Sequence, residues 1–168
     1  MIIEKIGLKH EEEILEMCKE YDLANEDYNG AFFLKNIIDY KDTIKELDNA
    51  SNGILSNPDY VPYTAYVFIV DNKIVGVGSL RHCLNEYLEN FGGHIGYSIR
   101  PTERRKGFGK KALNLLLKEA EKKDIKKIII TCNSDNIGSQ KVIEGNNGVF
   151  VSKQELNGKN IFKYNINF

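Results

Sequence analysis

The sequence predicts an α/β protein with a mixed, mostly antiparallel central sheet flanked by helices. Apolar residues recur at helical spacing in several segments, most clearly over residues 107–123. Two β-branched and aromatic runs flank the pair Asp71-Asn72, which is typical of a hairpin. A helix between two apolar strands implies a crossover, and therefore two parallel neighbouring strands. Since 168 residues suffice for one core, we expect a single domain over residues 1–168.

The N-terminal half begins with a short strand that ends at Gly7. The spacing of Ile14, Leu15, Cys18 and Tyr21 predicts a helix over residues 10–21. A second helix is expected over residues 30–48. Residues 49–63, rich in Asn, Ser, Gly and Pro, read as a loop.

The C-terminal half predicts strands separated by two helices. The expected elements, in order, are a hairpin of strands 66–70 and 73–80, a strand 94–99 stopped by Pro101, a helix 107–123, a strand 128–132, a helix 136–146 capped by Asp135 or Asn136, and a hairpin of strands 149–151 and 161–168 turning near Asn157-Gly158.

The overall composition excludes several classes. The chain has 23 Lys and Arg against 24 Asp and Glu, and so lacks the basic excess of a nucleic-acid binder. No apolar run approaches the roughly 18 residues that span a bilayer, and the first residues do not resemble a secretory signal. Three scattered cysteines without a CxxC pair favour a reducing cytoplasm and predict no metal site.

The charge is distributed unevenly. Residues 100–111 hold six basic side chains against Glu103 alone, a net charge of +5 on an otherwise acidic chain. Such concentration favours a local anionic ligand over a polyanion, although charge runs often mark only a solvated surface.

Within this segment, Gly107 and Gly109 open the predicted helix. Glycine lets a ligand approach the backbone, and the unpaired N–H groups of a first helical turn attract anions. The pattern therefore predicts a pyrophosphate cradle. A Walker A loop is excluded, because Arg104 and Lys111 stand where it needs a glycine and a Ser or Thr. The match to G-x-G-x-x-A, a dinucleotide fingerprint, is weak because several charged residues separate it from the strand.

Residues 104–109 (Arg-Arg-Lys-Gly-Phe-Gly) resemble the acyl-CoA-binding motif Q/R-x-x-G-x-G/A of the GNAT-type N-acetyltransferases. The predicted element order matches that fold, and residues 133–144 resemble the family's second motif. Residues 80–101 are similar to a bacterial branch of predicted acetyltransferases without an assigned substrate.

The resemblance implies acetyl-CoA as cosubstrate. Backbone amides from Arg105 to Lys110 would hold its pyrophosphate, the strand end from Ser98 to Arg100 would pair with its pantetheine, and the acyl group would lie between strands 94–99 and 128–132. A backbone N–H near Ile99 would stabilise an oxyanion. The implied cofactor-binding residues are Ser98, Ile99, Arg100, Arg104, Arg105, Lys106, Gly107, Phe108, Gly109, Lys110, Asn136 and Ser139.

The residues for acid–base chemistry are less well defined. His94 is the first candidate for the general base, followed by Glu86 and Glu89. The family often uses a tyrosine as general acid, but Ile143 stands in that slot here, so Tyr97 is the substitute candidate. Each also has a structural interpretation: a hydrogen-bonded histidine, solvated loop carboxylates and a core aromatic. Cys132 is expected to be a small buried residue and not a nucleophile.

The predicted function is direct transfer of an acetyl group from acetyl-CoA to an amine of a small molecule or peptide. Residues 30–63 are expected to shape the acceptor site. We predict a monomer or homodimer with neither nucleic-acid nor membrane partners. The alternative is a non-catalytic acyl-CoA-binding sensor or regulatory module.

Overall fold

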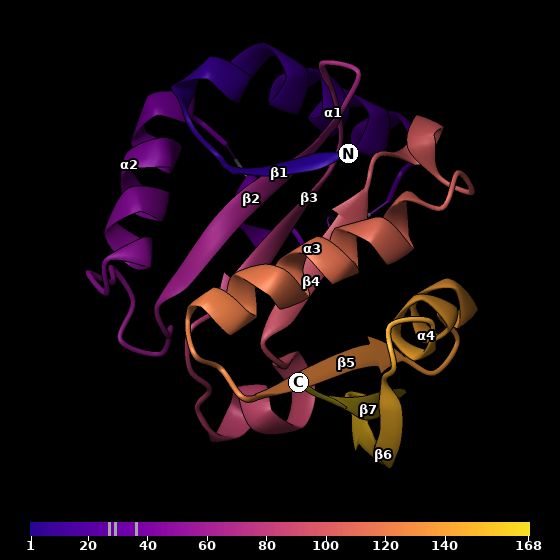
Figure 1. Cartoon of the computed structure of the whole chain (residues 1–168). Coiled ribbons are helices and arrows are strands. Elements are labelled where there is room, and N and C mark those ends of the chain that lie inside the picture. The colour runs from indigo at the N-terminus through magenta and orange to yellow at the C-terminus, as the bar shows by residue number, and fades with distance from the viewer. Residues whose placement is uncertain (27, 29, 36) are drawn as a thin grey trace.

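The computed structural model describes residues 1–26, 28, 30–35 and 37–168 (Figure 1). The strands are β1 (Ile2–Lys5), β2 (Tyr63–Val70), β3 (Lys73–Arg81), β4 (Ile95–Ile99), β5 (Lys127–Asn133), β6 (Val149–Leu156) and β7 (Lys159–Asn167). The α-helices are α1 (Glu11–Leu23), α2 (Tyr40–Ser51), α3 (Phe108–Lys122) and α4 (Ile137–Glu144). Short helical turns span Leu8–His10 (η1), Phe32–Leu34 (η2), Leu88–Gly92 (η3) and Pro101–Glu103 (η4).

The strands form two sheets. One has the order β1-β2-β3-β4 and the other β5-β7-β6, with antiparallel neighbours throughout. This confirms the mixed α/β class with a mostly antiparallel sheet. The parallel pairing expected between residues 94–99 and 128–132 is reduced to one backbone hydrogen bond, in which His94 N–H donates to the Ile129 carbonyl over 2.7 Å. Beyond this bond β4 and β5 separate, and we call the opening the fork.

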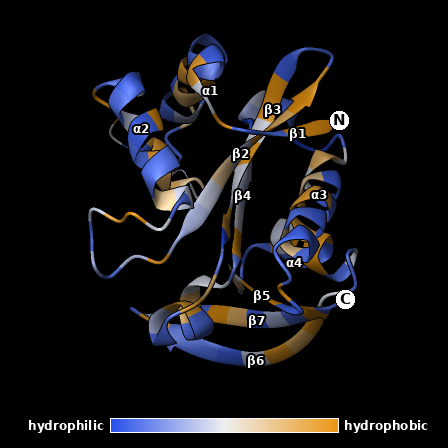
Figure 2. Cartoon of the chain, turned by 60° about the vertical axis from the view of Figure 1, so that its left-hand side comes forward, coloured by the Kyte–Doolittle hydropathy of each residue, from blue (hydrophilic) through white to orange (hydrophobic). Residues whose placement is uncertain are grey.

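Helices cover both faces of the four-stranded sheet. Figure 2 shows α1 and α2 on one side and α3 with α4 on the other. The first core layer joins Ile14 and Met17 of α1 and Leu47 of α2 to Val67 of β2. The second joins α3 to both sheets, with a wholly buried Leu116 among its members. Apolar stripes at helical spacing account for both layers.

Several boundaries differ from the sequence prediction. The helix expected over residues 30–48 begins only at Tyr40, where the Asp39 carboxylate caps it by accepting the Asp42 N–H; Asn36, in the same range, lies outside the described residues. The last hairpin is longer than expected but turns at Asn157 and Gly158 as predicted, and both residues take positive φ. Along the described part of the chain, no helix is long and apolar enough to cross a membrane.

Candidate active site

The start of α3 exposes a set of backbone N–H groups. Arg105 and Gly107 adopt left-handed backbone angles, with φ of 64° and 78°, and turn the chain sharply into the helix. The first helical bond runs from Lys111 N–H to the Gly107 carbonyl, and Gly107 supplies no side-chain cap. The amides of Phe108, Gly109 and Lys110 therefore have no acceptor within the helix, as an anion cradle requires.

The two glycines of this motif serve different purposes. A Cβ on Gly107 would meet no atom within 4 Å, so the backbone there lies open to a ligand. A Cβ on Gly109 would lie 3.2 Å from Cγ2 of Val142 in α4. Gly109 thus permits close packing between α3 and α4, a purpose that the sequence pattern alone did not indicate.

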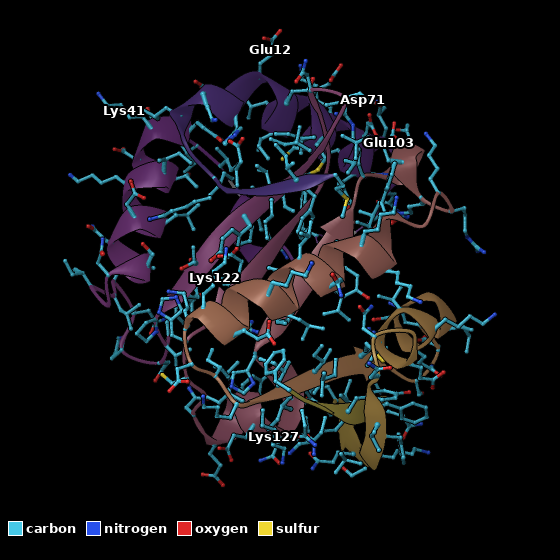
Figure 3. All side chains as sticks on the ribbon, in the orientation of Figure 1. Glu12, Lys41, Asp71, Glu103, Lys122 and Lys127 are labelled. Carbon is cyan, nitrogen blue, oxygen red and sulfur yellow. The ribbon has the colours of Figure 1, made fainter. Side chains whose placement is uncertain are left out.

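The predicted cations around this turn divide into two groups. Arg104 makes a two-pronged ion pair with Glu26, at 2.9 and 2.7 Å, and Lys106 pairs with Glu103 at 2.8 Å. Figure 3 labels Glu103 in the turn that precedes α3. Arg105 and Lys110 are exposed and form no ion pair with any described residue. These two side chains are therefore the ones available to an external phosphate.

The hydrogen-bond phase of β4 determines which backbone groups face the fork. Arg81 N–H donates to the His94 carbonyl and Arg100 N–H to the Val75 carbonyl, so even-numbered residues of β4 direct their backbone toward β3. Tyr97 and Ile99 consequently direct theirs toward the fork. The Ile99 carbonyl already accepts bonds from Tyr21 Oη and Arg104 Nε, whereas the Ile99 N–H has no partner among the described residues and is open to a ligand.

Arg100, predicted to contact the cofactor, is engaged elsewhere. Its side chain is 2% exposed and reaches Glu13, Glu16 and Glu20 of α1 at 2.6 to 3.0 Å. With its N–H committed to β3 as well, Arg100 fixes α1 to the end of β4 and has no group free for a cofactor. The spacing of the three glutamates along one helix face was the sequence signal for this cluster.

Ser98 shares the phase of Arg100. Its backbone faces β3, and this buried residue takes part in a further interaction.

His94, the first candidate base, joins the two sheets. Its Nδ1 accepts the Ile129 N–H over 3.0 Å, and its side chain is buried. A neutral imidazole has a single ring lone pair, so this bond places the proton on Nε2 and leaves no basic nitrogen for an amine. Burial and the charge of Arg81 lower the pKa of His94, which favours the neutral ring. The geometry supports the structural interpretation.

Tyr97 extends from β4 toward α4. Its hydroxyl lies 3.3 Å from Oγ of Ser139, near Cys132 of β5. Burial raises the pKa of Tyr97 to about 12 and that of Cys132 to about 11. Both side chains keep their protons at neutral pH, so Tyr97 can donate one and Cys132 is a poor nucleophile.

The remaining predicted residues lie at the periphery. Glu86 and Glu89 are exposed in and before η3, on the chain segment leading into the fork. The Asn136 side chain caps α4 by accepting the Ser139 N–H over 2.9 Å, which confirms it as the cap. Its amide Nδ2 remains a free donor for a cofactor among the contacts of the described residues.

The structure also has an open hollow of about 550 Å³ far from these groups. It lies between β1, β2 and the C-terminal end of α3, where Figure 3 labels Lys122. Its cations are partly neutralised, Lys5 by Asp48 and Lys122 by Glu119. Nothing there matches the chemistry of the fork.

The model of the Acetyltransferase (GNAT) family matches residues 20–148, and the chain belongs to this family. It is therefore an N-acetyltransferase that uses acetyl-CoA, as the sequence motif implied. The chain is also 29% identical over 118 residues to the uncharacterized N-acetyltransferase YjdG of Bacillus subtilis, covering 60% of this chain and 70% of the relative.

Solved structures share the fold at low sequence identity. RimL, a ribosomal L7/L12 α-N-protein acetyltransferase solved with coenzyme A, has a TM-score of 0.70 at 17% identity, covering 98% of this chain and 92% of its own. The ribosomal-protein-S5-alanine acetyltransferase of Vibrio fischeri has a TM-score of 0.73 at 18% identity, covering 98% and 91%. The microcin C7 self-immunity acetyltransferase MccE, solved with acetyl-CoA and AMP, has a TM-score of 0.70 at 21% identity, covering 99% and 91%.

Proposed function

We propose that this enzyme transfers the acetyl group of acetyl-CoA directly to an amine held in the fork between β4 and β5. The observation that carries the proposal is the alignment of two features along β4. The open amides of α3 lie beyond its C-terminal end, and the N–H of Ile99 faces the fork at that end, whereas the backbone of Gly30 lies against that of Tyr97. A pyrophosphate bound at the first feature directs the thioester along the second.

The proposed reaction begins when a neutral amine attacks the thioester carbonyl. The Ile99 N–H stabilises the oxyanion of the tetrahedral intermediate. As the carbon–sulfur bond breaks, Tyr97 donates its proton to the departing thiolate, and the amine loses a proton to complete the balance. Direct transfer is favoured over an acyl-cysteine route because the raised pKa of Cys132 keeps its sulfur protonated.

Glu89 is the proposed final acceptor for the proton of the amine, which reaches it through water in the fork because Glu89 lies at the His94 end of β4, away from Ile99. The lone pair of His94 is committed to Ile129, which leaves the two carboxylates before β4 as bases. Of these, Glu89 is the one whose charge acts on His94, at the start of the fork. Its exposure permits exchange of the proton with solvent.

The acceptor is proposed to be an amine of a small molecule or a peptide. The fold relatives include enzymes named for protein N-termini and for an antibiotic, which agrees with this range. We place the reaction in the cytoplasm, in keeping with three free cysteines among the described residues.

The test combines calorimetry with a thiol-release assay over a broad panel of amines. We expect binding of acetyl-CoA and CoA release that depends on at least one amine. Binding without turnover of any amine would favour the acyl-CoA sensor, and no binding at millimolar acetyl-CoA would overturn both functions. Phe108→Pro, which removes one of the cradle amides, should weaken binding, whereas the surface variant Lys118→Gln should not.

A further inference from the structure

Arg81, at the end of β3, carries a charge that no carboxylate neutralises within the described part of the chain. Its Nη1 donates to the carbonyls of Gly92 and Gly93, at 3.2 and 2.9 Å. Its Nε and Nη2 have no hydrogen-bond partner among the described residues. One nitrogen holds the guanidinium in place. The other two nitrogens therefore present donors side by side, in the planar arrangement that suits a carboxylate-like anion.

The surroundings of Arg81 make an unneutralised charge costly. The side chain is half-buried, and burial lowers the pKa of Arg81. Its Cζ lies 5.5 Å from the centroid of the Phe32 ring, which also packs against Tyr60 and Tyr63. Phe32 and Tyr60 are 36% and 49% exposed. We call these four residues the Arg81 cluster; it offers a cation beside an accessible aromatic wall.

The Arg81 cluster lies at the end of β4 opposite the pyrophosphate cradle. Arg81 N–H donates to the carbonyl of His94, which in turn binds Ile129 where the two sheets meet. β4 then runs five residues toward α3, about 16 Å at 3.3 Å per residue. Phe32, Tyr60 and Tyr63 belong to the segment expected to shape the acceptor site. A molecule that enters the fork from this end meets the thioester from the side away from the nucleotide.

We propose that Arg81 binds a carboxylate of the acceptor, so that the substrates are amino acids or short peptides whose reacting amine lies several bonds from that carboxylate. This inference rests on the proposed acetyl transfer and adds the class of acceptor. The separation follows from the offset between Arg81, paired with His94, and the Tyr97 and Ile99 amides, at least three residues or about 10 Å along β4. The aromatic wall packs against the carbon chain between the two groups.

The experiment uses acceptors in matched pairs, each ω-amino acid or short peptide as its free acid and as its amide, with an aminoalkyl phosphonate of similar length as a third arm. For wild type we expect kcat/KM to be at least about tenfold higher for the free acids, the value of one charge-assisted hydrogen bond. Arg81→Gln should reduce this ratio to about one while the Kd of acetyl-CoA stays unchanged. Arg105→Asn is the matched control and should weaken acetyl-CoA binding without changing the ratio.

The ratio distinguishes recognition from a purely structural role, because a distorted fold lowers the rates of acid and amide together. If Arg81→Gln does not fold, the acid-to-amide ratio of kcat/KM is measured in Arg81→Lys and compared with the ratio in wild type. Equal rates for acid and amide in wild type overturn the role of Arg81 and leave acetyl transfer standing, and a preference for the phosphonate overturns the carboxylate assignment. If no amine is turned over, acetyl transfer fails, and equilibrium binding of the same pairs to the CoA-saturated enzyme decides whether Arg81 selects the acid.

Discussion

The N–H of Ile129 donates to Nδ1 of His94, and the N–H of His94 donates to the carbonyl of Ile129. This reciprocal pair is the point at which the two sheets are joined and from which β4 and β5 diverge. It gives His94 a positioning role, since the side chain replaces the backbone bond that a continuous parallel ladder would supply. The opening of the fork therefore depends on one side chain.

We predict that His94→Ala destabilises the fold by about 1–3 kcal/mol, the cost of leaving the half-buried Ile129 N–H unpaired. Chemical denaturation measures this loss. His94→Asn should recover part of it, because an amide oxygen can accept the same bond. If His94 were the general base, both variants would instead abolish turnover at full stability, and the acidic limb of the kcat/KM profile would disappear.

The pH dependence of stability provides a second prediction. Burial lowers the pKa of both His82 and His94, with the charges of Lys123 and Arg81 acting in the same direction. Near pH 6.5 the unfolded chain therefore binds protons that the folded chain does not, so stability falls as pH drops below about 6.5. Denaturation at pH 7.5 and 5.5 measures the difference, and the decrease should be smaller in His82→Gln. Equal stability at the two pH values would contradict the burial of neutral histidines.

The sequence predicted most elements because local patterns decided them. The apolar stripe of α3, the Asp71-Asn72 turn and the Asn136 cap required no knowledge of distant residues. The fork was harder, since the separation of β4 from β5 depends on a side chain that contacts a strand 35 residues away. The α2 start was misplaced because helical periodicity continues through Phe33 and Ile37 although Asp39 caps the helix later.

The parts of the site that depend on backbone conformation could be predicted from the sequence. The parts that depend on ion pairs between distant side chains could not. Two glycines after a basic run marked the cradle, yet no sequence pattern separates Arg104, which pairs with Glu26, from Arg105, which forms no ion pair with any described residue. Arg81 was missed for a related reason. Its importance comes from the lack of a carboxylate partner among the described residues and from Phe32, which lies 49 positions earlier in the chain.

Arg100 offers a third prediction. Arg100→Gln should destabilise the fold by about 3 kcal/mol, because Glu13, Glu16 and Glu20 then face one another without a cation. Although burial acts to raise the pKa of Glu20, hydrogen bonds from Arg100 and Thr102 hold it below its usual value. Glu16→Gln is the control: since that carboxylate is 60% exposed, its loss should cost less than about 1 kcal/mol. Similar losses in the two variants would argue against a buried cluster.

Arg105 and Lys110, the cradle cations without an ion-pair partner in the described part of the chain, lead to a fourth prediction. Arg105→Asn keeps a residue that tolerates positive φ and removes the charge, and Lys110→Gln removes a second one. Each should weaken acetyl-CoA binding about tenfold. Raising the salt concentration should reduce the affinity of both variants less than it reduces the affinity of wild type. Calorimetry at two salt concentrations checks this, with Lys118→Gln as the matched surface control. Unchanged affinity in both variants would show that the phosphates of acetyl-CoA do not bind at this turn.

The fifth prediction concerns Tyr97. If its hydroxyl protonates the departing thiolate, Tyr97→Phe should lower kcat about 100-fold with little change in the Kd of acetyl-CoA. Because burial raises the pKa of Tyr97 to about 12, wild-type kcat should show no alkaline limb from this group below about pH 10. Ser139→Ala removes only the hydrogen-bond partner 3.3 Å from the hydroxyl and should have a smaller effect. Steady-state kinetics with calorimetry separates these outcomes, and equal kcat in Tyr97→Phe and wild type would show that the thiolate leaves unassisted.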